Sequence, residues 1–455
     1  MAPKPKAPSY VLGVGMTKFI KPRGKVDYTE LGFEAGVKAM LDAQINYDDV
    51  EQGVACYCYG DSTCGQRVFY QFGMTQIPIY NVNNNCSTGS TGLAMARQFV
   101  SSGAADCVLV VGFEKMMPGS LQSFFNDREN PTGTTVKMMA ETRGITKAPG
   151  AAQMFGNAGR EYMEKHGAEA RDFAEIARVN HEHSTRNPYS QFQDVYTLDQ
   201  ILDAPMIHAP LTKLQCCPTS DGAAAAVVVS QAFLDARPHL KSQAVLIAGQ
   251  CMATDAPSLF SRSAIDLMGF EMTQHAVRVA AAEAGIDVAR DVQVVELHDC
   301  FSANELIVLD ALGLAKPGKA HELVRAGDIT YGGRYIVNPS GGLISKGHPL
   351  GATGHRPVRR ARLAPARLGQ QPRRQGHARR AAAQPRPRRC RRCNRLQESR
   401  RRRGPRRRRQ GRWQGQRPRL QPSRRGEGVH QGGSQEGQEQ NGEQRLGAAG
   451  HAGQG

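Results

Sequence analysis

Short apolar runs alternate with amphipathic stretches through the first hundred residues of the chain. Residues 10–14 predict a buried strand, and residues 28–41 carry apolar side chains at helical spacing, with Asp27 as a helix N-cap. Further strands are predicted at residues 54–59, 77–82 and 107–111, and a further helix at residues 92–100. This alternation favours an α/β fold in which helices connect the strands of a parallel sheet.

A weaker copy of this pattern returns later in the chain. Residues 37–50 resemble residues 277–292, and an apolar strand precedes each stretch, the second at residues 244–248. Such an internal repeat predicts two similar halves, which we place at residues 1–240 and 241–354.

Residues 114–218 interrupt the first half. They are richer in polar residues, Met and Gly, and residues 170–180 predict a helix. We therefore predict a large insertion. Long insertions on a rigid α/β scaffold commonly carry substrate contacts.

The composition changes abruptly at His355. Residues 355–455 contain 29 Arg, no Lys and five acidic residues, which gives this segment a net charge of +24. The whole chain has a net charge of +18, so residues 1–354 have a net charge of −6. Few large apolar residues are present to offset the entropy of ordering the backbone, which predicts a disordered, Arg-rich tail of low complexity. The Arg runs at 401–403 and 406–409 could bind nucleic acid non-specifically through phosphate contacts.

Other features narrow the class of protein. No run of 18 apolar residues predicts a membrane span, and no apolar segment near the start predicts a secretory signal. The cysteines are therefore expected to be reduced. Cys56, Cys58 and Cys64 are irregularly spaced for zinc. Cys216 and Cys217 are adjacent and cannot both face one metal in a regular strand, so we predict no metal site.

The first group of reactive side chains, NCSTGS at residues 85–90, lies between a predicted strand and a predicted helix. A cysteine at a helix N-terminus meets the positive end of the helix dipole and free backbone N–H groups, which favour a thiolate at Cys86. The same N–H groups could receive an oxyanion. The alternative is that Cys86 packs as a small hydrophobic residue.

The second group, HDCFSANE at residues 298–305, follows an apolar strand predicted at residues 292–297. The end of a parallel strand is the usual active-site edge of such a sheet. His298 and Cys300 are the candidates for chemistry there. A structural, hydrogen-bonded histidine is the alternative for His298.

The third group comprises NPSGG at residues 338–342 and SKGHPLGATG at residues 345–354. Its glycines permit close backbone approach, and Pro349 suits the first turn of a helix. In the repeat, this helix start is the counterpart of the one that carries Cys86. The two helix starts would bring Cys86 and His348 together, as a cysteine–histidine catalytic pair requires.

Together these motifs resemble the thiolase superfamily, in its sterol carrier protein x subtype. The resemblance runs from about Pro8 to Gly354 and includes CCPTSDGAAA at residues 216–225, which resembles the family's strand that closes the first half. It implies an α/β, thiolase-like fold of two βαβαβαββ halves, with the insertion in the first half and the second half incomplete.

The resemblance also implies a two-step acyl transfer in the β-oxidation of fatty acids or of branched or sterol side chains. Cys86 would attack the carbonyl of a 3-oxoacyl-CoA and hold the acyl group, while His348 takes its proton. His298, where other thiolases usually have asparagine, would support an oxyanion hole. Cys300 would act as acid and base on the α-carbon of the leaving acyl-CoA. The thiol of coenzyme A then receives the acyl group.

Further expectations come with the family. Coenzyme A is the co-substrate, and no metal or redox cofactor is implied. Asn338, Gly341 and Gly342 are expected to bind substrate. A homodimer is expected, in peroxisomes or the cytoplasm, although residues 451–455 form no Ser-Lys-Leu address.

The resemblance stops at Gly354, where family members continue with an apolar helix and further strands. We expect a shift of reading frame near that codon, because the bases encoding residues 357–364 can encode a family-like segment in another frame. With the tail as it stands, unpaired sheet edges predict a poorly folded or inactive chain.

Two other functions stay open. A condensing enzyme of the ketoacyl synthase or hydroxymethylglutaryl-CoA synthase kind also pairs Cys with His, and the HDC and GHP motifs favour a thiolase over it. Nucleic-acid binding by the tail is the second, with Trp413 as its one aromatic side chain for stacking.

Overall fold

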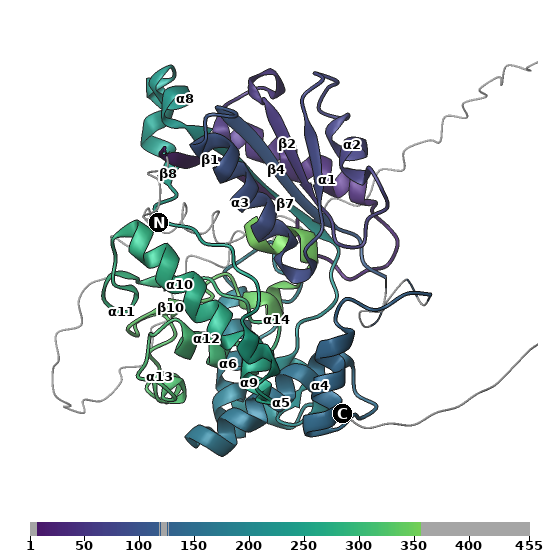
Figure 1. Cartoon of the computed structure of the whole chain (residues 1–455), viewed down its shortest axis with the longest axis vertical. Coiled ribbons are helices and arrows are strands. Elements are labelled where there is room, and N and C mark those ends of the chain that lie inside the picture. Colours follow the sequence, from purple (N-terminus) through teal and green to yellow (C-terminus); the bar gives the residue numbers. More distant parts are fainter. Residues whose placement is uncertain (1–6, 118, 120–124, 126, 356–455) are drawn as a thin grey trace, which may run out of the picture. The chain divides into compact units, whose positions relative to one another are not determined.

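The computed structural model describes residues 7–117, 119, 125 and 127–355 (Figure 1). The segment for which we predicted disorder and nucleic-acid binding, residues 355–455, lies outside the described residues apart from His355.

A mixed, six-stranded sheet is the centre of the first half, with strand order β3-β2-β4-β7-β1-β8 (Figure 1). The strands are β1 (Ser9–Met16), β2 (Gln52–Cys56), β3 (Ile79–Val82), β4 (Cys107–Glu114), β7 (Gly222–Ser230) and β8 (Val245–Leu246). The predictions of strands at 10–14, 54–59, 77–82 and 107–111 are confirmed within a few residues at their ends.

Within the six-stranded sheet, the prediction of parallel strands is correct only for β2, β3 and β4. β7 runs antiparallel to both β4 and β1, and β8 runs antiparallel to β1. The path of the chain explains the difference. β4 ends at Glu114, the insertion follows, and β7 begins at Gly222, which pairs with Glu114. Because the chain leaves and re-enters the sheet at the same end, β7 must run antiparallel to β4.

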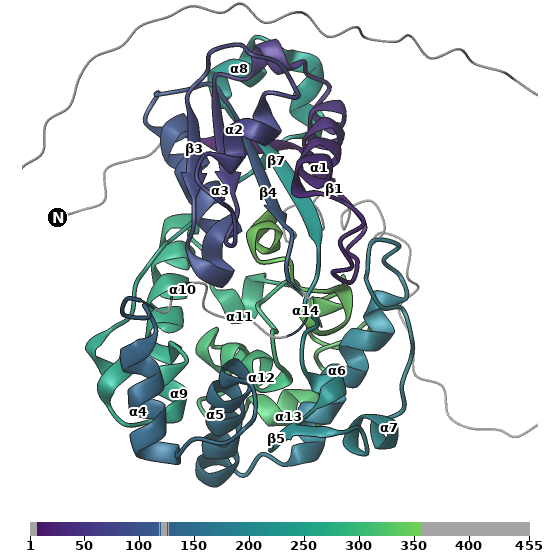
Figure 2. The ribbon, with the colours of Figure 1, turned by 90° about the vertical axis from the view of Figure 1, so that its right-hand side faces the viewer.

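Two helices cover opposite faces of this sheet (Figure 2). α1 (Tyr28–Ala43) starts after Asp27, whose carboxylate accepts a hydrogen bond from the first backbone N–H of the helix at 2.6 Å. It packs on the face that includes Leu109, whereas α3 (Thr88–Ser101) packs on the face that includes Val110. Both predicted helices are confirmed, and each buries one apolar side against the sheet.

The insertion is mainly helical. It contains α4 (Gly133–Arg143), α5 (Gly150–His166), α6 (Ala170–Ser184) and α7 (Leu198–Leu202), then the hairpin of β5 (Met206–His208) and β6 (Leu211–Thr212). α5 and α6 share a hydrophobic core with α12 (Ser302–Ala311), the helix that follows the HDC motif (Figure 2). The helix predicted at residues 170–180 is confirmed, and the insertion supports the second half of the chain.

The second half has little sheet among the described residues. β9 (Val294–Val295) and β10 (Ile336–Val337) form a parallel pair, and β8 adds to the edge of the first sheet. The strands predicted at residues 244–248 and 292–297 are therefore only two residues long. A strand is held by backbone hydrogen bonds to its neighbours, and the described residues supply few neighbours here. The observation agrees with an incomplete second half.

The repeated helices differ in the same way. α10 (Phe270–Ala284) is the counterpart of α1, yet none of its residues is buried, whereas α1 buries seven. The other helices are short: α2 (Cys64–Phe69), α8 (Gln231–Asp235), α9 (Ala264–Leu267), α11 (Val288–Asp291), α13 (Ala320–Arg325) and α14 (Gly342–Lys346). Within the described part of the chain, no helix has the length and apolar character needed to cross a membrane.

Candidate active site

Cys86 lies in η2 (Asn85–Ser87), a single 3₁₀ turn between β3 and α3. The turn is held by two hydrogen bonds of one hydroxyl group: Thr88 Oγ1 accepts from the backbone N–H of Asn84 at 2.8 Å and donates to the carbonyl of Asn85 at 2.6 Å. Asn85 has φ of 47°, a left-handed conformation that few residues other than glycine adopt. In this turn the residue Cys86 as a whole is half-buried, while its thiol group is desolvated.

His348 lies between α14 and η6 (Leu350–His355) and is buried. Its backbone N–H donates to the Ser220 hydroxyl at 2.9 Å, and Thr219 forms a parallel bridge with it. Gly351, three residues later, has no room for a side chain, because a Cβ atom would lie 2.3 Å from the carbonyl oxygen of Cys56. The segment before β7 and the end of β2 therefore fix the position of the histidine.

Cys86 and His348 meet as predicted. The thiol of Cys86 lies 3.3 Å from Nε2 of His348. On the other side of the ring, Nδ1 lies 2.8 Å from the hydroxyl of Thr353, which donates its own proton to the carbonyl of Pro349 at 3.0 Å. This network assigns the proton of the neutral imidazole to Nδ1. Nε2 then carries the lone pair and can take the proton of Cys86.

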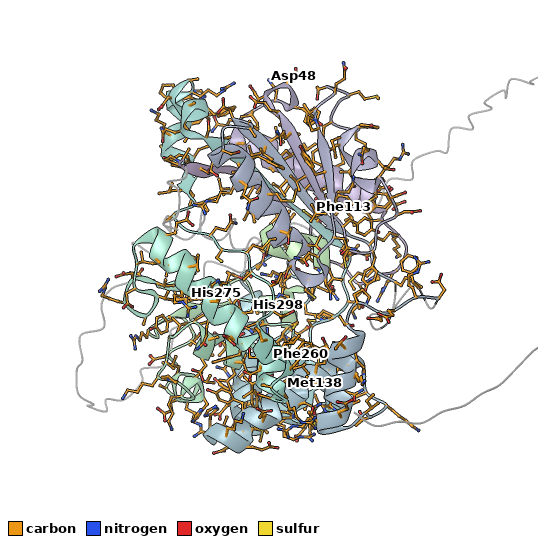
Figure 3. The ribbon with its side chains drawn as sticks, in the orientation of Figure 1. Asp48, Phe113, Met138, Phe260, His275 and His298 are labelled. Atoms are coloured by element: carbon orange, nitrogen blue, oxygen red, sulfur yellow. The ribbon has the colours of Figure 1, made fainter. Side chains whose placement is uncertain are left out.

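His298 and Cys300 are brought to the same place. The rings of His298, labelled in Figure 3, and His348 are 5.0 Å apart between centroids and nearly perpendicular, at 79°. The sulfur of Cys86 and one nitrogen of each histidine all lie within 4.8 Å of one another. Cys300 is buried, its carbonyl accepts from the backbone N–H of Cys217 at 2.9 Å, and the charge of Cys86 acts on its thiol. The structure therefore groups Cys86, His298 and His348 directly, with Cys300 within electrostatic reach of Cys86.

The electrostatics of the two cysteines favour thiols at rest. Burial, and after it the charge of Glu114, raise the pKa of Cys86 to about 12. Burial also raises the pKa of Cys300 well above its usual value, with smaller contributions from the charges of Cys217 and Cys86. Desolvation thus acts against the thiolate that the helix N-terminus was expected to favour at Cys86. Deprotonation requires a base, and His348 is in position to act as one.

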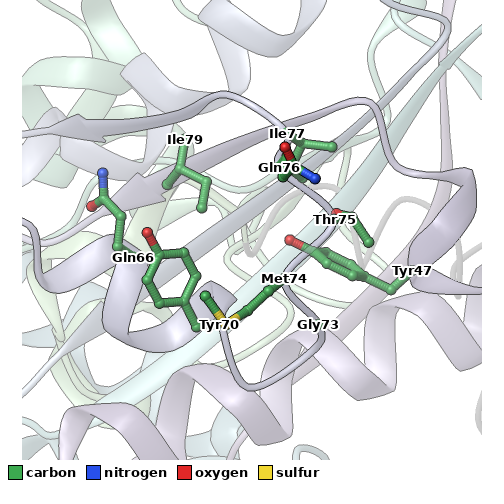
Figure 4. Close-up of a pocket in the computed structure, with 9 residues that line it drawn as sticks. All are labelled: Tyr47, Gln66, Tyr70, Gly73, Met74, Thr75, Gln76, Ile77 and Ile79. Atoms are coloured by element: carbon green, nitrogen blue, oxygen red, sulfur yellow. The ribbon is translucent and has the colours of Figure 1, made fainter.

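A surface hollow elsewhere in the first half is not connected with these residues. It has a volume of about 240 Å³ and is shown in Figure 4. Its lining consists of Tyr47, Gln66, Tyr70, Gly73, Met74, Thr75, Gln76, Ile77 and Ile79. The lining includes none of the four predicted catalytic residues, so the hollow is separate from the candidate active site.

Comparison with known proteins identifies the family. Residues 9–232 match the thiolase N-terminal domain, and residues 253–360 match a family described as thiolase C-terminal domain-like. A protein of Caenorhabditis elegans named non-specific lipid-transfer protein-like 2 is 48% identical over 77% of this chain and 86% of its own length. The chain belongs to the thiolase family.

A second relative and a solved structure add to the comparison, the structure for the fold alone. Sterol carrier protein 2 of Gallus gallus is 56% identical over 76% of the chain, and the match spans only 63% of that relative's length. Human mitochondrial 3-ketoacyl-CoA thiolase has a similar fold, with a TM-score of 0.60 at 17% identity over 80% of this chain and 93% of its own. The expected thiolase-like fold is confirmed by both kinds of comparison.

Within this thiolase-family fold, a buried polar network that the sequence did not reveal supports the HDC motif. The carboxylate of Asp299 accepts from the backbone N–H of Leu343 at 2.6 Å, at the start of α14, and from the side-chain amide of Asn180 at 3.0 Å. The same amide donates to Glu305 at 2.7 Å. Asp299 and Glu305 belong to the motif quoted from the sequence, whereas Asn180 comes from the insertion and no local pattern pointed to it.

The residues expected to bind substrate lie in this network. Asn338 is fully buried, its side chain donates to Glu305 at 2.9 Å, and it accepts from the backbone N–H of Leu297 at 3.0 Å. A Cβ atom on Gly342 would lie 1.9 Å from a carboxylate oxygen of Asp299, and one on Gly341 would meet Ser184. Asn338, Gly341 and Gly342 therefore join the two catalytic motifs, and their contact with substrate stays a prediction.

Glu114 was also missed. This buried residue ends β4 and accepts hydrogen bonds from the backbone N–H groups of Cys58 at 3.2 Å, Tyr59 at 3.0 Å and Gly351 at 2.8 Å. Burial raises its pKa to about 7. One carboxylate thus ties β4 and the segment after β2 to the turn that follows His348, and its charge acts on the thiol of Cys86.

Proposed function

We propose that this thiolase-family sequence encodes an acyl-CoA C-acyltransferase that cleaves 3-oxoacyl-CoA with coenzyme A. The observation that carries the proposal is the 3.3 Å contact between Cys86 Sγ and Nε2 of His348, with the His298 ring beside it. A base at hydrogen-bond distance from a cysteine, oriented by a third group, is the arrangement of an activated nucleophile. The names of relatives, such as acetyl-CoA acetyltransferase of Methanocaldococcus jannaschii, point to the same chemistry.

The first half-reaction breaks a carbon–carbon bond. The proton of the Cys86 thiol moves to Nε2 of His348, and the sulfur attacks the C3 carbonyl of the substrate. The C2–C3 bond then breaks, and its electron pair stays on C2 as the enolate of a thioester. His298 and His348 stabilise the negative oxygen. Cys300 donates its proton to C2, which releases a shorter acyl-CoA and leaves the acyl group on Cys86.

The second half-reaction restores the enzyme. The Cys300 thiolate takes the proton of coenzyme A, whose sulfur attacks the acyl group on Cys86. The Cys86 sulfur leaves and recovers its proton from His348. All four residues return to their starting protonation states, and no metal or redox group is needed for the balance.

The most direct test is an assay for the products. A protein in which residues 1–354 are fused to the corresponding C-terminal thiolase segment of the Gallus gallus relative should consume 3-oxoacyl-CoA and coenzyme A in equal amounts. Replacement of Cys86 by Ala should abolish consumption. A condensing enzyme would instead join two acyl groups and release coenzyme A or carbon dioxide. Loss of 3-oxoacyl-CoA without use of coenzyme A would contradict the proposal.

Finer properties are proposed on the family relationship alone. We propose a homodimer, acyl-CoA substrates from the oxidation of fatty acids or of branched or sterol side chains, and a location in peroxisomes or the cytoplasm. The name sterol carrier protein 2 among the relatives supports this choice of substrates. Size-exclusion chromatography with light scattering and fluorescence microscopy of the tagged protein test the assembly and the location.

The state of the C-terminal segment is a separate proposal. We propose that the reading frame shifts near the codon for Gly354 and that the chain with its Arg-rich tail has little thiolase activity. The lack of buried residues in α10 and the two-residue lengths of β9 and β10 support this proposal. Sequencing the gene across that codon tests the first part, and an unshifted gene that encodes a fully active chain would contradict both.

A further inference from the structure

One side-chain cluster in the described part of the chain has the composition of a metal site. Cys86, His298 and His348 each offer one ligand atom, and these atoms lie within 4.8 Å of one another. The spacing of the cysteines in the sequence predicted no metal site. Cysteine spacing can reveal only those metal sites whose ligands come from one or two short segments of the chain. Here the three ligands come from η2, the segment after β9 and the segment after α14.

We propose that Cys86, His298 and His348 bind a Zn²⁺ ion that occupies the position of the substrate carbonyl and blocks the nucleophile. The ion is an inhibitor in this proposal and takes no part in the reaction. One thiolate sulfur and two imidazole nitrogens are ligands that zinc prefers, and three protein ligands leave a fourth position for water or the thiol of coenzyme A.

The distances suit tetrahedral zinc. Zn–S and Zn–N bonds of about 2.3 and 2.0–2.1 Å place neighbouring ligand atoms about 3.3–3.6 Å apart. A sulfur and a nitrogen ligand lie at the upper end of this range, and the 3.3 Å between Cys86 Sγ and His348 Nε2 is only about 0.2–0.3 Å shorter. Two imidazoles on one tetrahedral ion have centroids about 5 Å apart, given those bond lengths. The centroids of His298 and His348 are 5.0 Å apart, so the longest of the ligand distances needs only a side-chain adjustment.

The surroundings of His348 and Cys86 suit a cation as well. Nδ1 of His348 contacts the hydroxyl of Thr353 at 2.8 Å, so Nε2 is oriented toward the sulfur. Metal-binding histidines are commonly oriented by such a hydrogen bond from the second ring nitrogen.

Binding of zinc alone tests the site on the full chain. ZnCl₂ is titrated calorimetrically into the chain without substrate, and iodoacetamide labelling of Cys86 is followed by peptide mass spectrometry. The variant His298→Asn removes one ligand. Its matched control is His275→Asn, which changes an exposed histidine on α10, also labelled in Figure 3. Co²⁺ replaces Zn²⁺ in a parallel experiment, because a tetrahedral thiolate–Co²⁺ complex absorbs visible light.

We expect one zinc ion per chain, protection of Cys86 from labelling, and the same result for His275→Asn. His298→Asn should bind at least tenfold more weakly and lose the protection and the cobalt absorption. Two results would overturn the site. One is equal zinc affinity of His298→Asn and His275→Asn, which a misfolded chain with scattered ligands would also give. The other is labelling of Cys86 at saturating zinc.

Only the inhibition rests on the proposed thiolase function. A chain that binds zinc through His298 but has no thiolase activity refutes the function and leaves the metal site intact. An active fusion protein in which zinc neither protects Cys86 nor slows thiolysis refutes the site and leaves the function intact.

Discussion

The hydroxyl of Thr353 lies 2.8 Å from Nδ1 of His348 and thereby decides which ring nitrogen faces Cys86. Because this hydroxyl donates its proton to the carbonyl of Pro349, it can only accept from Nδ1. The basic lone pair of His348 is therefore on Nε2, at 3.3 Å from the thiol. The orientation of the proposed base therefore depends on Thr353, a residue outside the group of Cys86, His298 and His348.

Replacement of Thr353 by Val should lower kcat by about tenfold or more, because the ring can then adopt the tautomer that faces Cys86 with N–H. KM should change little, since Thr353 positions the base and is not expected to bind acyl-CoA. Steady-state thiolysis by the fusion protein measures both constants. Thr353→Ser keeps the hydroxyl and should retain most of the activity. Full activity of Thr353→Val together with a loss in Thr353→Ser would show that the methyl group, and not the hydrogen bond, matters.

The charge of Glu114 should be visible in the pH dependence of Cys86 labelling. Glu114→Gln removes the charge that helps raise the pKa of Cys86, so the thiolate fraction rises about tenfold for each unit by which that pKa falls. The pKa of Glu114 is about 7, so the wild-type residue is neutral below that pH. The variant should be labelled faster above pH 7, and the difference should vanish below it.

Iodoacetamide labelling rates from pH 5 to 9, resolved for the Cys86 peptide, measure this difference. Glu322→Gln, at an exposed position on α13, is the matched control and should follow the wild type. A constant ratio of rates across the whole pH range would contradict an effect of the Glu114 charge.

Buried Glu305 predicts how stability changes with pH. Burial and, after it, the charge of Asp299 raise the pKa of Glu305 well above its usual value, and its Oε1 atom has no hydrogen-bond partner among the described residues. The folded chain thus holds a proton that the unfolded chain releases above about pH 4.3. Stability from this proton is fully present below that pH and is lost as the pH rises toward the raised pKa.

Glu305→Gln is neutral at every pH and keeps an oxygen to accept from Asn180 and Asn338. The midpoint of urea unfolding, followed by circular dichroism, should therefore fall less between pH 5 and 8 in the variant than in the wild type. Asp299, whose pKa burial also raises, to about 7, is present in both proteins, so the difference between their slopes measures Glu305 together with its interaction with Asp299. Parallel slopes for variant and wild type would refute the assignment to Glu305.

The meeting of Cys86, His298 and His348 could be predicted because these residues lie in short, ordered motifs at the ends of predicted elements. The internal repeat paired the start of η6 with the turn that carries Cys86, and the structure places His348 beside that thiol. The network behind the motifs could not be predicted, since Asn180 and Asp299 are 119 residues apart and only tertiary packing brings them together. The antiparallel direction of β7 was missed for the same reason.

The unequal partners of the internal repeat give a final prediction. α1 buries seven residues, whereas its counterpart α10 buries none. Because helices of this length owe most of their stability to tertiary packing, α10 should open locally far more often. Hydrogen exchange followed by mass spectrometry on the full chain should show amides in α10 at least about 100-fold less protected than those in α1. In the fusion with a complete thiolase C-terminal segment, protection of α10 should rise while that of α1 stays unchanged. Equal protection of the two helices in the full chain would mean that α10 is packed by residues outside the described part, and that the second half is not incomplete.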